Sequence, residues 1–168
     1  MTENPSFGTR QKQFIAFVCI NCDCEEHSSE QLPVINNCSV KGTIINSAQS
    51  WSESGGITGY VCQGLIMNCM ADVVIEGTSS SNYVEAGGIA GLGGYSALYN
   101  NYAKGSIHAT AGVNSASIGG IVGMNGGTVV NNTADVELIS TRSSIDIGGI
   151  TGRNTGIALI ADHISTVA

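Results

Sequence analysis

The sequence predicts an all-β fold, a right-handed parallel β-helix of four to five turns with about 31 residues in each turn. The pentapeptide GGIxG occurs four times, and its first and last glycines are Gly55 and Gly59, Gly87 and Gly91, Gly119 and Gly123, and Gly148 and Gly152. A second column with nearly the same spacing begins at Asn37, Asn68, Asn100 and Asn131. Two columns that share one period indicate strands that stack turn upon turn.

Short apolar stretches within each repeat alternate with Ser, Gly and Asn clusters, which is typical of strands and turns. We expect three strands in each turn: one at GGIxG, one leading into the asparagine, and one ending on the column Ile44, Ile75, Ile107 and Leu138. The isoleucines of GGIxG, which are Ile57, Ile89, Ile121 and Ile150, are predicted to form an internal stack. The asparagine column is predicted to form an amide ladder at a turn, where asparagine tolerates left-handed backbone.

One column alternates in charge from turn to turn, with the sequence Lys41, Asp72, Lys104 and Asp135. If this column faces solvent, every neighbouring pair is opposite in sign and supports the correct register. A second expectation concerns the small residues Thr58, Ala90, Val122 and Thr151, which we expect to form a flat outer strip suited to close packing.

Composition excludes several function classes. The 168-residue chain has a formal net charge of −7 and only six lysines and arginines, too few for a surface that neutralises nucleic-acid phosphates. No apolar run reaches the roughly 18 residues of a membrane span, so no membrane insertion is expected. Arg10 and Lys12 precede a short apolar run that lacks a cleavage site, so no signal peptide is expected.

The clearest repeats read GGIVGMNGGTVVNNTADV over residues 119–136 and GGIAGLGGYSALYNNYAKGSI over residues 87–107. They resemble the GLUG repeat family, whose units form β-helical modules of bacterial surface and secreted proteins. The resemblance implies a non-enzymatic, extracellular spacer or adhesion scaffold within a larger protein. It places repeats over residues 34–168 and an N-terminal cap with an irregular first turn over residues 1–33. The family includes regions of immunoglobulin A-cleaving metallopeptidases, but this chain has no HExxH motif.

The last repeat departs from the pattern, because Ile160 and Ala161 appear where the asparagine pair is expected. The sequence shows no C-terminal cap, and an open turn exposes unpaired backbone groups. We therefore expect end-to-end self-association or a continuation of the chain, together with contact to a protein or glycan surface. Five tyrosines are candidates for that contact or for packing at turns: Tyr60, Tyr83, Tyr95, Tyr99 and Tyr102.

Two constellations offer alternative chemistry. Cys19, Cys22, Cys24 and His27 have the spacing of a zinc site, but Cys22, Cys38 and Cys69 follow repeat asparagines, where a small thiol is a common filler. Structural cysteines and no cofactor are therefore expected. The second is the acidic set of Asp135 and Asp146 with Arg142, which would suit a polysaccharide hydrolase or lyase. The charge ladder already accounts for Asp135, so the non-enzymatic reading is preferred.

Overall fold

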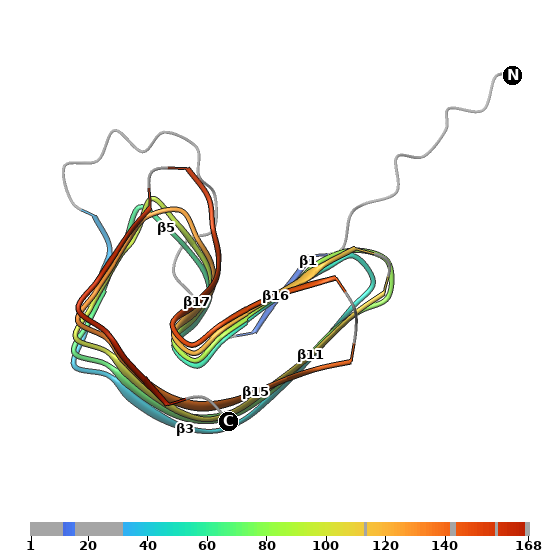
Figure 1. Ribbon diagram of the computed structural model, residues 1–168, viewed down its shortest axis with the longest axis horizontal. Coiled ribbons are helices and arrows are strands. Elements are labelled where there is room, and N and C mark those ends of the chain that lie inside the picture. Colours follow the sequence, from blue (N-terminus) through green and yellow to red (C-terminus); the bar gives the residue numbers. More distant parts are fainter. Residues whose placement is uncertain (1–11, 16–31, 113, 142–143, 157, 167–168) are drawn as a thin grey trace, which may run out of the picture.

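The computed structural model is a parallel β-solenoid of about four turns with about 31 residues per turn, which confirms the predicted fold (Figure 1). It describes residues 12–15, 32–112, 114–141, 144–156 and 158–166. Every regular element among them is a strand, and each strand pairs in parallel with its equivalent in the next turn. The segment Lys12–Ile15 (β1) pairs with Trp51–Gly55 (β4), so part of the predicted cap region joins the first stacked sheet.

Each turn contains four strands, not the three that the sequence predicts, because GGIxG bends sharply and divides into two strands. The chain passes in each turn through four sheets in the order A, D, B and C. Sheet A contains β1, β4, Val84–Gly87 (β8), Ala116–Gly119 (β12) and Ile145–Gly148 (β16). Sheet D contains Thr58–Cys62 (β5), Ala90–Gly94 (β9), Val122–Asn125 (β13) and Thr151–Asn154 (β17).

The remaining two sheets complete the turn. Sheet B contains Val34–Asn36 (β2), Leu65–Met67 (β6), Ala97–Tyr99 (β10), Thr128–Val130 (β14) and Leu159–Ala161 (β18). Sheet C contains Ser39–Ala48 (β3), Met70–Ser79 (β7), Tyr102–Ala111 (β11), Thr133–Ser140 (β15) and Ile164–Thr166 (β19). Sheets A and D meet at an inward bend that faces sheet C across the core (Figure 1).

The glycines of GGIxG make this bend possible. A Cβ on Gly88 would lie 2.5 Å from the Cβ of Ala103 in sheet C, and a Cβ on Gly91 would lie 2.5 Å from the backbone nitrogen of Ser54 in sheet A. Real Cβ atoms do not approach other heavy atoms this closely. The second glycine therefore lets the bend reach the small alanine column of sheet C, and the last glycine lets sheet D approach sheet A.

The interior is a stack of aliphatic columns. Ile57, Ile89 and Ile121 are fully buried, which confirms the predicted isoleucine stack for these three, and Ile150 in the last turn is partly buried and packs against the core. The expected outer strip of small residues is wrong, because Thr58, Ala90 and Val122 are also buried. Ala90 and Val122 belong to the hydrophobic core, since the sharp bend turns this position inward.

The predicted asparagine ladder is present at the corner between sheets B and C. Asn37, Asn68, Asn100 and Asn131 all have φ between 54° and 57°. The Asn131 amide donates to Oδ1 of Asn100 over 2.7 Å, and Asn100 donates to Asn68 over 3.4 Å. Asn68 donates to Asn36 rather than to Asn37. The ladder thus ties successive turns together at a strained corner.

The ladder continues into the last turn, which corrects the expectation for Ile160 and Ala161. Ala161 pairs with Val130, so the equivalents of the asparagine pair are Asp162, with φ of 57°, and His163. The Nδ1 atom of His163 accepts the backbone N–H of Asn132 over 3.1 Å, where the preceding turn uses the side chain of Asn132 to accept the N–H of Asn101 over 2.9 Å. The imidazole nitrogen of His163 therefore accepts the same kind of backbone hydrogen bond as the amide oxygen of Asn132.

The charge ladder lies on the outer face of sheet C, with Lys41, Asp72, Lys104 and Asp135 in register. Asp72 Oδ2 lies 3.0 Å from Lys41 Nζ and 3.2 Å from Lys104 Nζ. Hydrogen bonds from Lys41 and then Lys104 hold the pKa of Asp72 below its ordinary value. The alternation predicted from the sequence is thus confirmed for these three residues.

Candidate functional site

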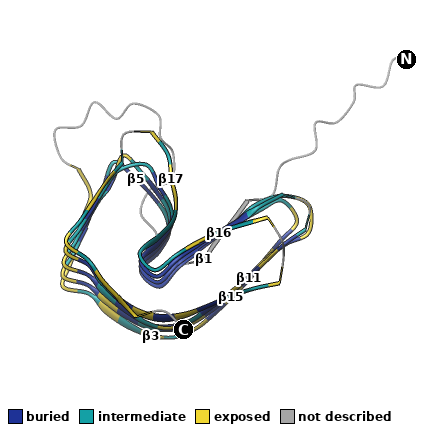
Figure 2. Cartoon of the chain, viewed as in Figure 1, coloured by how far each residue is buried: buried dark blue, intermediate teal, exposed yellow. Residues whose placement is uncertain are grey.

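A narrow recess follows the inward bend along the outside of the solenoid. Strands β8 and β12 are buried at every position, although successive side chains of a strand point to opposite faces. The inward-facing residues belong to the core, so the outward-facing ones are covered by the opposite wall, which is sheet D. Figure 2 shows a continuous run of buried residues at the bend, whereas buried and exposed residues alternate along sheet C.

An acidic column forms one wall of the recess. Glu53, Glu85, Ser117 and Asp146 occupy equivalent positions on β4, β8, β12 and β16. Glu53 is only 2% exposed and Glu85 only 4%, whereas Asp146 in the last complete turn is about half exposed. Each residue stands two positions before the first glycine of GGIxG, so the column is visible in the sequence once the repeats are aligned.

The opposite wall is mostly apolar. Tyr60, Leu92, Met124 and Arg153 occupy equivalent positions on sheet D. Arg153 reaches across to Asp146, and its Nε lies 3.9 Å from Oδ2 of that residue. The recess has a volume of about 210 Å³, and Trp51, Tyr83, Glu85, Ser117, Met124, Arg153 and Thr155 line it.

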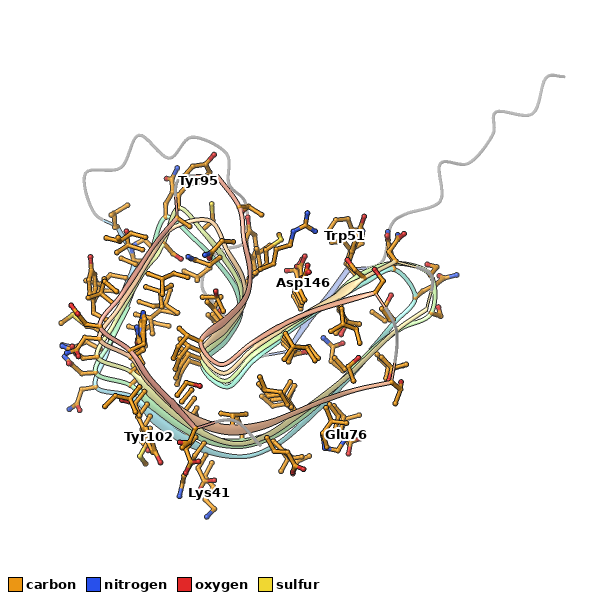
Figure 3. The ribbon with its side chains drawn as sticks, in the orientation of Figure 1. Lys41, Trp51, Glu76, Tyr95, Tyr102 and Asp146 are labelled. Atoms are coloured by element: carbon orange, nitrogen blue, oxygen red, sulfur yellow. The ribbon has the colours of Figure 1, made fainter. Side chains whose placement is uncertain are left out.

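Aromatic rings stand on the outer rim of the acidic wall. The ring centroids of Trp51 and Tyr83 lie 5.0 Å apart at an interplanar angle of 49°. Each stands two positions before a residue of the acidic column, Trp51 as the first residue of β4 and Tyr83 immediately before β8. Figure 3 shows Trp51 and Asp146 on the same side of the recess, with Lys41 on the opposite face of the molecule.

A larger pocket lies at the corner between sheets D and B. We call it the tyrosine pocket. Its volume is about 700 Å³, and it is lined by Tyr60, Leu92, Gly94, Tyr95, Met124, Gly126, Thr155 and Gly156. Met124 and Thr155 also line the recess, so the two cavities form one continuous concave face. Tyr95 is 80% exposed and has a φ of 50°.

The structure separates the acidic residues that the sequence offered as a catalytic set. Asp135 is exposed on the outer face of sheet C, whereas Asp146 lies in the recess on sheet A. Arg142 lies outside the described residues. Asp146 is instead paired with Arg153, and the carboxylates that share its column are Glu53 and Glu85, which sequence reasoning missed.

The five tyrosines also lie at different places on the molecule. Tyr60 and Tyr95 share the tyrosine pocket, and Tyr95 and Tyr99 line an adjoining cavity. Tyr83 packs on Trp51 at the rim of the recess, while Tyr102 lies on the outer side of sheet C (Figure 3). Three of the five, Tyr60, Tyr83 and Tyr95, thus border the recess or the tyrosine pocket.

The cysteines that the structure describes have structural positions. Cys38 and Cys69 are free thiols on neighbouring turns, in the column that continues as Asn101 and Asn132. Cys69 is 2% exposed, and burial raises the pKa of its thiol. Cys62 is disulfide-bonded. Cys19, Cys22, Cys24 and His27 lie outside the described residues, and among the residues described no three His, Cys, Asp or Glu side chains group as metal ligands do.

Comparisons add no relative to this picture: no family model, curated protein or solved structure matches the chain. Within the described ranges, no helix is long and apolar enough to cross a membrane.

Proposed function

We propose that the chain is a non-enzymatic β-solenoid module of a larger surface or secreted protein, in which it acts as a binding scaffold. The observation that carries this proposal is the continuous concave face formed by the recess and the tyrosine pocket. The glycines of the GGIxG repeats allow the bend between sheets A and D, and this bend forms the concave face.

Two further observations support the cellular setting. The disulfide at Cys62 favours an oxidising compartment such as the cell exterior. The repeats also resemble GLUG units, which occur in bacterial surface and secreted proteins. We therefore propose an extracellular or cell-surface location.

Adhesion through the concave face tests the proposal. The purified chain is coupled to beads, and retention is measured on films of defined polysaccharides and of extracellular-matrix protein. Met124→Trp fills the cavity that the recess and the tyrosine pocket share, so we expect it to lower retention about tenfold. Val74→Trp is the matched control, because Val74 is exposed on the outer face of sheet C.

Folding of both variants is checked by far-ultraviolet circular dichroism. Equal retention of Met124→Trp and the unmodified chain would contradict the concave face as the binding surface. The polysaccharide-processing alternative is tested in the same films. Release of new reducing ends, abolished by Glu85→Gln or Asp146→Asn, would overturn the non-enzymatic proposal.

A further inference from the structure

Tyr95 combines an exposed aromatic ring with a left-handed backbone conformation. It is 80% exposed, and its φ of 50° belongs to the left-handed region that costs free energy for residues with a side chain. The preceding turn has Gln63 at this corner with a φ of 53°, and the following turn has Gly126 and Gly127 there. Glycine would adopt this backbone conformation at lower cost, so the corner itself does not require a tyrosine.

A second aromatic ring flanks the same corner. A Cβ on Gly94, the residue before Tyr95, would lie 3.8 Å from both Cε2 and the hydroxyl of Tyr60. The ring of Tyr60 therefore lies beside the backbone that carries Tyr95, and the two tyrosines border one pocket with Leu92 and Met124. Figure 3 shows Tyr95 at the tip of this corner. The pocket thus offers aromatic faces, aliphatic side chains and glycine backbone.

This chemistry fits a pyranose ring. The face of a tyrosine ring carries partial negative charge and attracts the weakly positive C–H groups on one face of a sugar. Sugar hydroxyls need hydrogen-bond acceptors and donors nearby, and beside the recess the half-exposed carboxylate of Asp146 and guanidinium of Arg153 supply them. The volume of about 700 Å³ is in the range of pockets that take small organic ligands.

Electrostatics narrows the class of saccharide. The described residues of the recess include the acidic Glu85 and Asp146 and the basic Arg153, and the whole chain has a net charge of −7. A uronate or sialylated chain would be repelled by both. We propose that the tyrosine pocket binds an uncharged oligosaccharide that stacks on Tyr60 and Tyr95 and extends into the recess. This proposal rests on the scaffold function proposed above and names its ligand.

Titration with defined oligosaccharides tests it. Neutral gluco-, galacto-, manno- and N-acetylglucosamine oligomers are compared with an oligouronate of matched length by isothermal titration calorimetry. At least one neutral oligomer is expected to bind, and the oligouronate is expected to bind about tenfold more weakly. Tyr95→Ala is expected to weaken binding of the neutral ligand about tenfold, because it removes one of the two aromatic faces on which the sugar stacks.

Two variants separate stacking from other effects. Tyr95→Phe keeps the ring and is expected to keep the affinity, and Tyr102→Ala removes a tyrosine from the outer side of sheet C and is expected to change nothing. Absence of binding to every neutral oligomer, equal binding of the oligouronate, or unchanged binding by Tyr95→Ala would overturn the saccharide proposal. If the chain still adhered to protein films and Met124→Trp still lowered that adhesion, the scaffold function would stand without the saccharide proposal. If the chain bound neither saccharides nor films, both proposals would be rejected.

Discussion

Residues with little or no side chain occupy the inward bend, because the backbone there lies close to sheet C. In the first three repeats the second glycine of GGIxG faces an alanine of sheet C in the same turn: Gly56 faces Ala71, Gly88 faces Ala103, and Gly120 faces Ala134. The alanines follow the repeat asparagine by three residues, so two columns far apart in the sequence are matched in size. The bend is therefore specified jointly by a missing side chain and a small one.

Replacement of Gly88 by alanine should be severely destabilising. The new Cβ would lie 2.5 Å from the Cβ of Ala103 and still closer to the backbone oxygen of Gly120, so the backbone has to move. We expect a loss of about 3 kcal/mol in the free energy of unfolding, measured by urea denaturation. Gly94→Ala is the matched control, because its nearest contacts would be at an ordinary 3.8 Å. Similar losses in both variants would contradict the account of the bend.

His163 shows how a residue in the last turn takes over an asparagine's part. Its Nδ1 accepts the backbone N–H of Asn132 over 3.1 Å, and its Nε2 lies 3.0 Å from the carbonyl oxygen of Val129. His163→Ala leaves that N–H without its acceptor and is expected to cost about 1 kcal/mol. His163→Asn restores the group used in the preceding turns and is expected to be nearly neutral. Hydrogen exchange of the Asn132 backbone amide is measured in both variants. Faster exchange in His163→Asn than in the unmodified chain would contradict the expectation that asparagine can replace histidine as the acceptor.

Elements were predictable from the sequence where one column marks one strand. The long strands of sheet C carry the Ile44, Ile75, Ile107 and Leu138 column, and both their existence and their register were predicted. The division of GGIxG into a strand of sheet A and one of sheet D was not. Periodicity indicates that a segment is extended. The bend depends instead on close approach between columns that are far apart in the sequence and meet only in the folded structure.

Sheet C also carries a pH-dependent contribution to stability, at Asp72. Lys41 and Lys104 lower the pKa of Asp72, so its stabilising contribution is fully present above the unfolded value of about 4 and is lost as the pH falls through the lower folded value. Asp72→Asn should therefore reduce stability at pH 7, and the deficit should vanish in acid. Denaturation midpoints measured from pH 7 down to pH 2 check this expectation.

Asp135→Asn is the control for the same column. Asp135 has a lysine on one side only, because its other neighbour is Thr166. We expect a smaller deficit at pH 7 than for Asp72→Asn. A deficit for Asp72→Asn that persists unchanged below its folded pKa would show that the ion pairs are not its cause.

At the scale of the whole molecule, the fold was predictable and the candidate site was not. Stacking columns require only a period, which GGIxG and the asparagines supply. The site depends on which columns face one another across the bend. Glu85 and Met124 lie 39 positions apart in the chain yet line the same recess. Sequence proximity instead grouped Asp135 with Asp146, which belong to different sheets. A concave cross-section leaves no mark in the repeat period.

A solenoid of equivalent turns should tolerate the loss of one complete turn. Thr128 is the equivalent of Ala97, so deletion of residues 97–127 joins Ser96 to Thr128 and keeps every later strand in its own sheet. Deletion of residues 97–112 removes only about half a turn and places strands of sheet A where sheet B belongs. Because turns contact only their neighbours, the first variant should fold cooperatively and the second should not.

The urea dependence of unfolding gives the quantitative check. The slope of the free energy against urea concentration scales with the surface exposed on unfolding. Loss of one turn in about four should therefore lower the slope by about a quarter, with a single transition retained. An unfolded 97–127 deletion, or a half-turn deletion that unfolds just as cooperatively, would contradict the equivalence of the turns. Such an outcome would mean that the ends, rather than the repeats, specify this fold.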